Sequence, residues 1–133
     1  METIGIPRSV INEIIDHAKA GYPDEVCGIV AGKEFSSAHL YNMTNTENSR
    51  VSYFMDPGEQ FQVMKDIRER KEKMLAIYHS HPDSVAFPSA KDVRLAYYPD
   101  SLYIIVSLAG DIPVLKAFSI NEGEIVEISV KPL

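Results

Sequence analysis

The chain has 133 residues and a formal net charge of -6, with 45% hydrophobic and 24% charged residues. This length and composition predict a single domain spanning residues 1–133, with a hydrophobic core that needs no disulfide. The acidic charge and the lack of a Lys/Arg cluster argue against a nucleic-acid partner. Cys27 is the only cysteine, which excludes an internal disulfide and a cysteine-rich zinc site. Because neither a signal peptide nor a membrane-length apolar run is visible, we expect a cytoplasmic protein without a membrane partner.

The first part of the chain predicts one helix followed by three strands. The helix should begin at Pro7, since proline favours the first helical turn, and end near Gly21. Residues 27–31 form a short apolar run that indicates a buried strand. Residues 35–43 and 51–55 predict two further strands, separated by a polar loop.

A second helix should follow Asp56, which resembles an N-cap because Pro57 comes next and an acidic residue lies three positions on. The helical spacing of three apolar residues predicts its buried face: Phe61, Met64 and Ile67.

The second half of the chain predicts four strands and one short helix. Residues 74–78 are apolar and indicate a central strand, and Ser89 resembles the cap of a helix that continues through residue 95. Three strands should follow, of which the last two resemble a half-exposed hairpin: 102–108, 114–120 and 124–130. This mixed order predicts an α/β fold with one sheet flanked by helices.

Two histidines, His79 and His81, lie two residues apart at the end of the central strand. Side chains of a strand alternate between its faces, so both imidazoles should point to the same side. Asp92 should lie in the first turn of the following helix, where Ser89 and Asp92 also fit a capping box. Two imidazoles and one carboxylate give the three protein ligands of a catalytic zinc site, with one position left for water.

Glu25 is the candidate general base, because hydrolysis at a metal site needs a group that accepts a proton from water and passes it on. It lies directly before the apolar strand that begins at Cys27. A nucleophilic role for Cys27 is disfavoured, since a free cysteine in a buried strand usually serves packing. The other two histidines receive no site role: His17 should lie near the C-terminal end of the first helix, where a partly charged imidazole suits the helix dipole, and His39 on a surface strand.

Together these residues resemble the JAMM, or MPN-plus, metallopeptidase family. The resemblance rests on Glu25, on the run His79-Ser80-His81-Pro82 and on Ser89-Ala90-Lys91-Asp92. It implies a deaminase-like α/β sandwich and a zinc ion bound by His79, His81 and Asp92. It also implies that Glu25 acts as acid and base, and that Ser89 donates a hydrogen bond to the oxyanion.

A narrower resemblance links the chain to small bacterial members of this family, some of which act on ubiquitin-like sulfur-carrier proteins. It rests on residues 22–28, 43–45 and 57–60. The resemblance implies hydrolysis of the amide after the C-terminal glycine of a carrier with a Gly-Gly tail, and cysteine is one of the leaving groups it allows. A peptide or a protein lysine stays open as the leaving group, and the oligomeric state is undetermined. The alternative from another class is a catalytically silent MPN-type scaffold that only binds partners.

Other metal enzymes fit the sequence less well. A zinc nucleoside deaminase needs a pair of cysteines, which a chain with one cysteine does not have. A non-haem iron oxygenase also uses two histidines and a carboxylate, but the expected helices argue against its usual β-barrel. For the proposed peptidase, we expect the carrier tail to add as a strand along residues 51–55.

Overall fold

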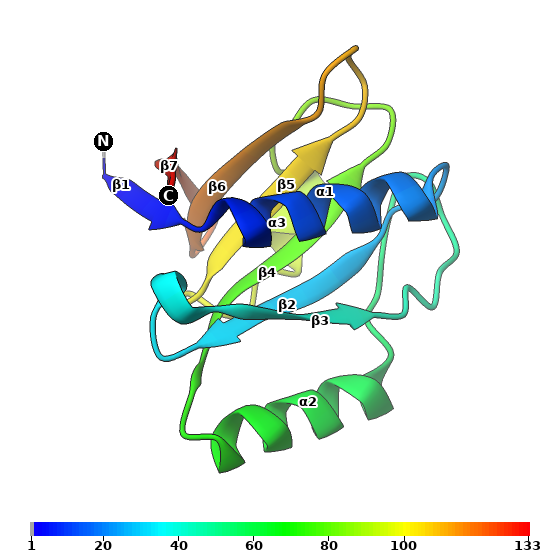
Figure 1. Ribbon diagram of the computed structural model, residues 1–133. Helices are drawn as coiled ribbons and strands as arrows, with labels where there is room; N and C mark the ends of the chain where they lie inside the picture. Colours follow the sequence, from blue (N-terminus) through cyan, green and yellow to red (C-terminus); the bar gives the residue numbers. More distant parts are fainter. Residues whose placement is uncertain (1) are drawn as a thin grey trace.

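A seven-stranded mixed sheet with strand order β1-β7-β6-β5-β4-β2-β3 forms the centre of the molecule. The computed structural model describes residues 2–133, and Figure 1 shows their arrangement. Strands β4 and β5 are parallel, as are β1 and β7, and the remaining pairs are antiparallel. The elements are β1 (Thr3–Ile6), α1 (Arg8–Gly21), β2 (Cys27–Gly32), η1 (Phe35–Ser37), β3 (His39–Met43), α2 (Pro57–Glu69), β4 (Lys73–His81), α3 (Ala90–Arg94), β5 (Leu102–Ser107), β6 (Val114–Asn121) and β7 (Glu124–Pro132).

The helices cover opposite faces of the sheet, and each face has its own hydrophobic core. In Figure 1, α1 lies in front of the sheet and α3 behind it. Helix α1 packs on the face that contains Tyr78, while α2 and α3 pack on the face that contains Ile77. Because side chains alternate along β4, His79 and His81 share a face with Ile77. The strand pattern therefore places both histidines on the side covered by α2 and α3.

Most of the expected elements are confirmed. The first helix begins after Pro7 and ends at Gly21, and Asp56 caps α2 by accepting a hydrogen bond from the backbone N–H of Glu59 at 3.0 Å. The central strand extends through His81, and the last three strands agree with their expected ranges to within two residues. The α/β sandwich expected from the sequence is thus confirmed. Among residues 2–133, no helix is long and apolar enough to cross a membrane.

The prediction of a strand at residues 51–55 is wrong. In this segment the backbone makes one isolated bridge, between Met55 and Asn45, and the Asn45 side chain forms hydrogen bonds with the backbone of Ser52 and Phe54. The expected docking of a carrier tail by strand addition required a strand at this segment, so the structure does not support it. Residues 35–43 are also less regular than expected, since a short 3-10 helix precedes β3.

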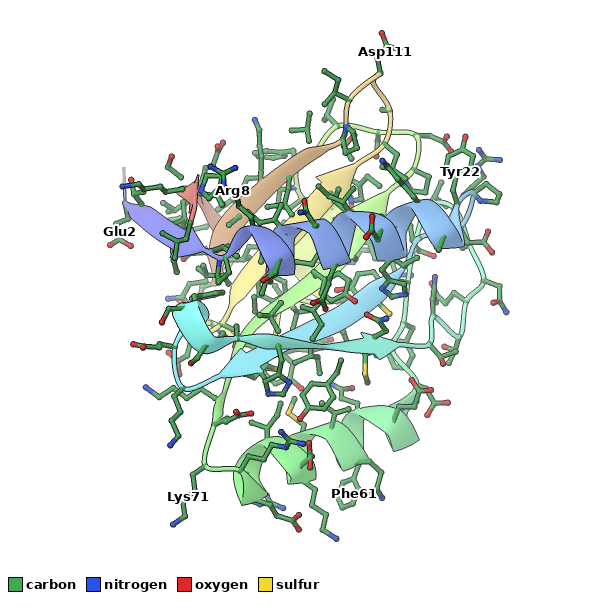
Figure 2. The ribbon with its side chains drawn as sticks, in the orientation of Figure 1. Glu2, Arg8, Tyr22, Phe61, Lys71 and Asp111 are labelled. Carbon is green, nitrogen blue, oxygen red and sulfur yellow. The ribbon has the colours of Figure 1, made fainter. Side chains whose placement is uncertain are left out.

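The expected buried face of α2 is wrong at Phe61. This side chain is 65% exposed, and Figure 2 shows it on the side of α2 away from the sheet. Ile67 is buried as expected, and Val63 packs against the same cluster. Because α2 lies near the edge strand β3, only a narrow stripe of the helix meets the sheet.

Strand β1 has no counterpart in the sequence prediction. It pairs in parallel with β7, which is therefore an interior strand and not the edge of a hairpin. Four residues at the start of a chain carry too little periodic signal to predict a strand. Their pairing partner lies more than 120 residues away in the sequence.

Candidate active site

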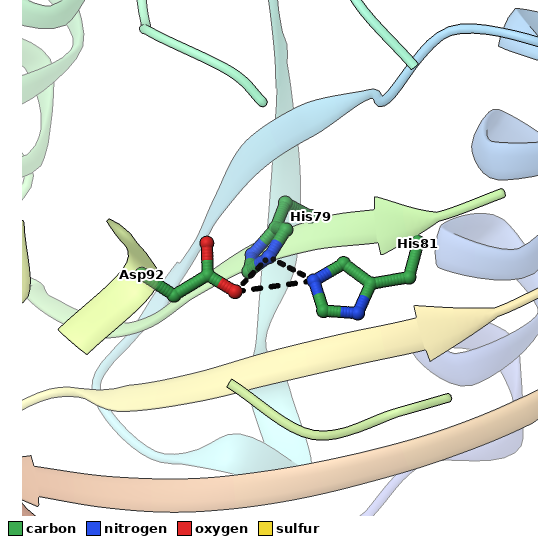
Figure 3. Close-up of side chains that lie close together, drawn as sticks. All are labelled: His79, His81 and Asp92. Carbon is green, nitrogen blue, oxygen red and sulfur yellow. Dashed lines mark hydrogen bonds and ion pairs between the residues drawn. The ribbon is translucent and has the colours of Figure 1, made fainter. Parts of the chain in front are cut away.

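The side chains of His79, His81 and Asp92 meet at the end of β4, as Figure 3 shows. The Nε2 atoms of the two imidazoles are 3.1 Å apart, and each lies 3.1 Å from Oδ2 of Asp92. His79 is 1% exposed and His81 is 4% exposed, so both rings are shielded from bulk water. Three donor atoms from two separate elements therefore point to one small space.

Helix α3 fixes the position of Asp92 through a capping box at its start. The hydroxyl oxygen of Ser89 accepts a hydrogen bond from the backbone N–H of Asp92 at 3.1 Å. In return, the backbone N–H of Ser89 donates to Oδ2 of Asp92 at 2.9 Å. The helix cap and the binding cluster thus share the same carboxylate, so the two interpretations of Ser89 and Asp92 hold together.

The proton of the His81 ring is positioned by a hydrogen bond at Nδ1, the nitrogen that faces away from Asp92. Its Nδ1 lies 2.8 Å from the carbonyl oxygen of Val85 and donates a hydrogen bond to it, because a carbonyl only accepts. In the neutral ring, Nε2 then keeps a free electron pair that points at the cluster. Burial would lower the pKa of His81, but hydrogen bonds to Asp92 and Val85 outweigh it and raise this pKa.

The ring of His79 is held by packing. Tyr53 stacks on it with ring centroids 4.6 Å apart, and Nδ1 of His79 is buried without a hydrogen-bond partner. Burial lowers the pKa of His79 and favours the neutral ring. Burial would raise the pKa of Asp92, but hydrogen bonds from both histidines and from Ser89 keep it well below its usual range. The cluster thus places two imidazoles around one ionised carboxylate.

These donors fit a zinc ion. With zinc–ligand bonds of about 2.1 Å, two ligand atoms of a tetrahedral site lie about 3.4 Å apart, near the observed 3.1 Å separations. Neutral imidazole nitrogens and a carboxylate oxygen are also the ligand types that zinc accepts. Three protein ligands, rather than four, are typical of a catalytic zinc site.

Glu25 lies at the His81 end of the cluster. Strand β2 is antiparallel to β4 with Cys27 opposite His79, which places residue 25 toward His81. Its side chain is 5% exposed, and its Oε1 has no hydrogen-bond partner. Burial raises the pKa of Glu25 to about 7, although the charge of His81 opposes this effect. A buried carboxyl group with this pKa can both accept and donate a proton near neutral pH.

Glu25 is held in position by two residues, Ser80 and Asn45, to which the sequence pattern assigned no role. Ser80, between the two histidines, accepts a hydrogen bond from the backbone N–H of Val26 at 2.9 Å. The amide of Asn45 donates to the carbonyl of Glu25 at 3.0 Å and to that of Ser52 at 3.1 Å, and its Oδ1 accepts from two further backbone N–H groups. A polar residue within a buried strand could have indicated a hydrogen-bonding role for Ser80. The sequence spacing of Asn45 does not predict which backbone groups its side chain would bond.

The other histidines and the cysteine lie outside the cluster. His17 forms a 2.7 Å hydrogen bond with the hydroxyl of Tyr78, and burial lowers its pKa, which opposes the partly charged imidazole expected near the helix end. His39 pairs with Glu72 at 2.7 Å on the edge strand. Cys27 is fully buried, and burial raises the pKa of its thiol to about 12, which agrees with a packing role.

The fold and this cluster together define a JAB/MPN-type hydrolase domain. Residues 7–121 match the family described as prokaryotic homologs of the JAB domain. The chain belongs to this family, which confirms the resemblance inferred from the sequence. Its structure resembles a JAB1/MPN domain protein from Archaeoglobus fulgidus in fold, with a TM-score of 0.61 at 23% identity over 96% of this chain and 98% of the other.

Several proteins are more similar to this chain over most of their length. A CysO-cysteine peptidase from Mycobacterium tuberculosis is 41% identical over 105 residues, which is 77% of this chain and 71% of that protein. A desampylase from Haloferax volcanii is 35% identical over 74% of this chain and 76% of that protein. A solution structure from Desulfitobacterium hafniense has a TM-score of 0.86 at 34% identity, over 98% of this chain and 93% of the other. These relatives confirm the expected enzyme class, a hydrolase of peptide or isopeptide bonds.

Proposed function

We propose that this chain, as one domain over residues 1–133, is a zinc peptidase that hydrolyses the amide after the C-terminal glycine of a ubiquitin-like or sulfur-carrier protein. The observation that carries the proposal is the convergence of two imidazoles and one carboxylate beside a buried carboxyl group with a raised pKa. A pure scaffold would not need this unpaired carboxyl group, which is costly to bury. We place the reaction in the cytoplasm, where carriers of this kind would be available.

One zinc ion would be held by His79, His81 and Asp92, with water as the fourth ligand. When bound, it would supply Lewis-acid chemistry by acidifying a water molecule and polarising the scissile carbonyl. The capping box and the Val85 carbonyl hold the ligands in place before any metal arrives. This preorganisation reduces the entropy that metal binding must offset.

Glu25 accepts the proton of the attacking water and then donates it to the departing amine. Its pKa of about 7 suits both transfers at neutral pH. Ser89 can donate to the developing oxyanion, because its hydroxyl oxygen accepts from the Asp92 N–H while its own O–H is left free to donate. Asn45 and Ser80 keep the Glu25 backbone in register with β4.

The substrate class follows from the relatives and from the motif. The similar protein from Mycobacterium tuberculosis is named a CysO-cysteine peptidase, so we propose cysteine released from the Gly-Gly tail of a carrier as the first reaction to examine. A protein lysine is the second leaving group, because a similar protein from Thermus thermophilus is named a probable TtuB-protein conjugate cleaving protease.

The direct test uses a sulfur-carrier protein with cysteine joined to its C-terminal glycine, incubated with zinc-loaded protein and followed by mass spectrometry. We expect loss of the cysteine, inhibition by a chelator and recovery on adding zinc. The Glu25→Gln variant should retain zinc, measured by metal analysis, and lose at least about a hundredfold in rate. Zinc-loaded protein that cleaves neither this adduct nor a glycine–lysine isopeptide would disprove the proposed function.

A further inference from the structure

A cavity of about 220 Å³ opens beside Asp92, on the same face of the sheet as the two histidines. Its wall includes Tyr53, Ile77, Leu95 and Tyr97. Tyr53 also stacks on His79, so one side chain contacts both the cavity and the candidate metal site. The cavity is therefore adjacent to the place where the scissile bond would lie.

The mouth of this cavity carries apolar side chains that face solvent. Phe54 is 50% exposed, Leu95 is 37% exposed and Tyr97 is 70% exposed. These residues come from two segments, the loop before α2 and the stretch that follows α3. Large apolar side chains that gather around one opening are typical of a surface that binds an apolar group.

The order of residues along β4 shows on which side of the metal ligands the cavity lies. Ile77, His79 and His81 share one face and follow each other at intervals of about 6.8 Å. The cavity lies at the Ile77 end, whereas Glu25 lies at the His81 end. In Figure 3, Asp92 likewise reaches the cluster from the side opposite the arrowhead at His81. Since Glu25 protonates the departing amine, the leaving group must lie at the His81 end.

We propose that the cavity binds a bulky apolar side chain of the acyl half of the substrate, within the last four residues before the scissile amide. This inference rests on the proposed function. An extended peptide spans about 6.8 Å for every two residues, so a chain whose terminal glycine lies at the metal ligands places a residue two to four positions from its end at the cavity. The substrate is thus a carrier with an apolar residue close to its glycine end.

The test uses synthetic peptides that end in Gly-Gly-Cys, with Leu, Ala or Asp at each of the two positions before the glycines. We expect zinc-loaded protein to cleave the best Leu peptide with a kcat/KM on the order of tenfold above its Ala counterpart, and to disfavour Asp. Phe54→Ala and Tyr97→Ala should bring the Leu/Ala ratio close to one, chiefly through KM. Phe61→Ala, which alters an exposed aromatic residue on α2 outside the cavity, should keep the ratio of the parent protein.

Binding to the Glu25→Gln variant separates failure of this inference from failure of the proposed function. NMR of that zinc-loaded variant should show the side-chain signals of Leu95 and Tyr97 shifting when the Leu peptide without its cysteine is added. If the parent cleaves no peptide but these shifts occur, the cavity assignment stands and the proposed reaction fails. The assignment is overturned if the shifts are absent, if the Leu/Ala ratio is the same in all variants, or if the cavity variants change preference for the leaving residue instead.

Discussion

The buried carboxyl group of Glu25 opposes folding when it is charged. Its pKa rises from an ordinary value of 4.5 to about 7 in the folded chain because burial disfavours the carboxylate. The folded state therefore binds a proton more tightly than the unfolded state does. This contribution to stability is fully present below pH 4.5 and is lost as the pH rises through 7.

Glu25→Gln should consequently stabilise the metal-free protein at high pH although it slows hydrolysis by the zinc-loaded protein. The pKa shift corresponds to about 3 kcal/mol. At about pH 8 the free energy of unfolding of the variant should exceed that of the parent by this amount, and at about pH 4 the two should not differ in this way. Urea unfolding in the presence of a chelator, at several pH values, measures this difference. Parallel stability curves for the two proteins would show that Glu25 is not held with a raised pKa.

Asn45 illustrates a residue that acts through its neighbours. Its side chain makes two hydrogen bonds as a donor and two as an acceptor, which fix the loop over the site and the carbonyl of Glu25. Asn45→Ala should lower the free energy of unfolding by about 2 kcal/mol, because four backbone groups, two of them partly buried, lose their partners.

The same variant should keep its zinc but lose on the order of tenfold in kcat, since Glu25 would no longer be held in position. Chemical denaturation, metal analysis and peptide kinetics measure the three effects. Asn12→Ala, an exposed change on α1, is the matched control and should behave like the parent. Loss of zinc together with activity would instead indicate general disruption of the site.

At the scale of elements, the contact between β2 and β4 determines the geometry of the site. Gly28 is opposite Tyr78 in this pairing, and a Cβ atom at position 28 would lie 2.2 Å from the Tyr78 ring. The ring cannot move away easily, because it is fully buried and its hydroxyl contacts His17 and Asn42. The close approach of these two strands keeps Glu25 beside His81.

Gly28→Ala should therefore destabilise the fold by about 2 kcal/mol through overpacking. Thermal unfolding measures this loss, and Gly110→Ala is a suitable control because the nearest atom to its new Cβ would be 3.9 Å away. Equal melting temperatures for the two variants would contradict the overpacking argument.

At the scale of the whole molecule, β1 forms one edge of the sheet and covers the C-terminal part of β7. Thr3–Ile6 pairs with residues 129–132, and Ile6 is fully buried in the core beneath α1. Without this strand, the backbone groups of β7 would form an open edge next to exposed apolar residues such as Val126. An open edge of this kind promotes association between chains.

Removal of residues 1–6 should lower the melting temperature and cause association that increases with concentration. Light scattering after size-exclusion chromatography detects the association, and Thr3→Ala controls for a change of an exposed residue on the same strand. A truncated protein that stays monomeric with an unchanged melting temperature would show that β1 does not protect β7.

The sequence by itself determined those features that depend on neighbours along the chain. Alternation along residues 74–81 placed His79 and His81 on one face, and the capping pattern placed Asp92 in the first turn of α3. The tertiary structure alone decided the pairing of β1 with β7, the irregular backbone of residues 51–55 and the burial of Glu25. Each of these depends on partners distant in the sequence, such as the strand β7 for β1 and the side chain of Asn45 for the loop over the site. Local periodicity carries no information about such contacts, because they form only when the strands assemble into a sheet.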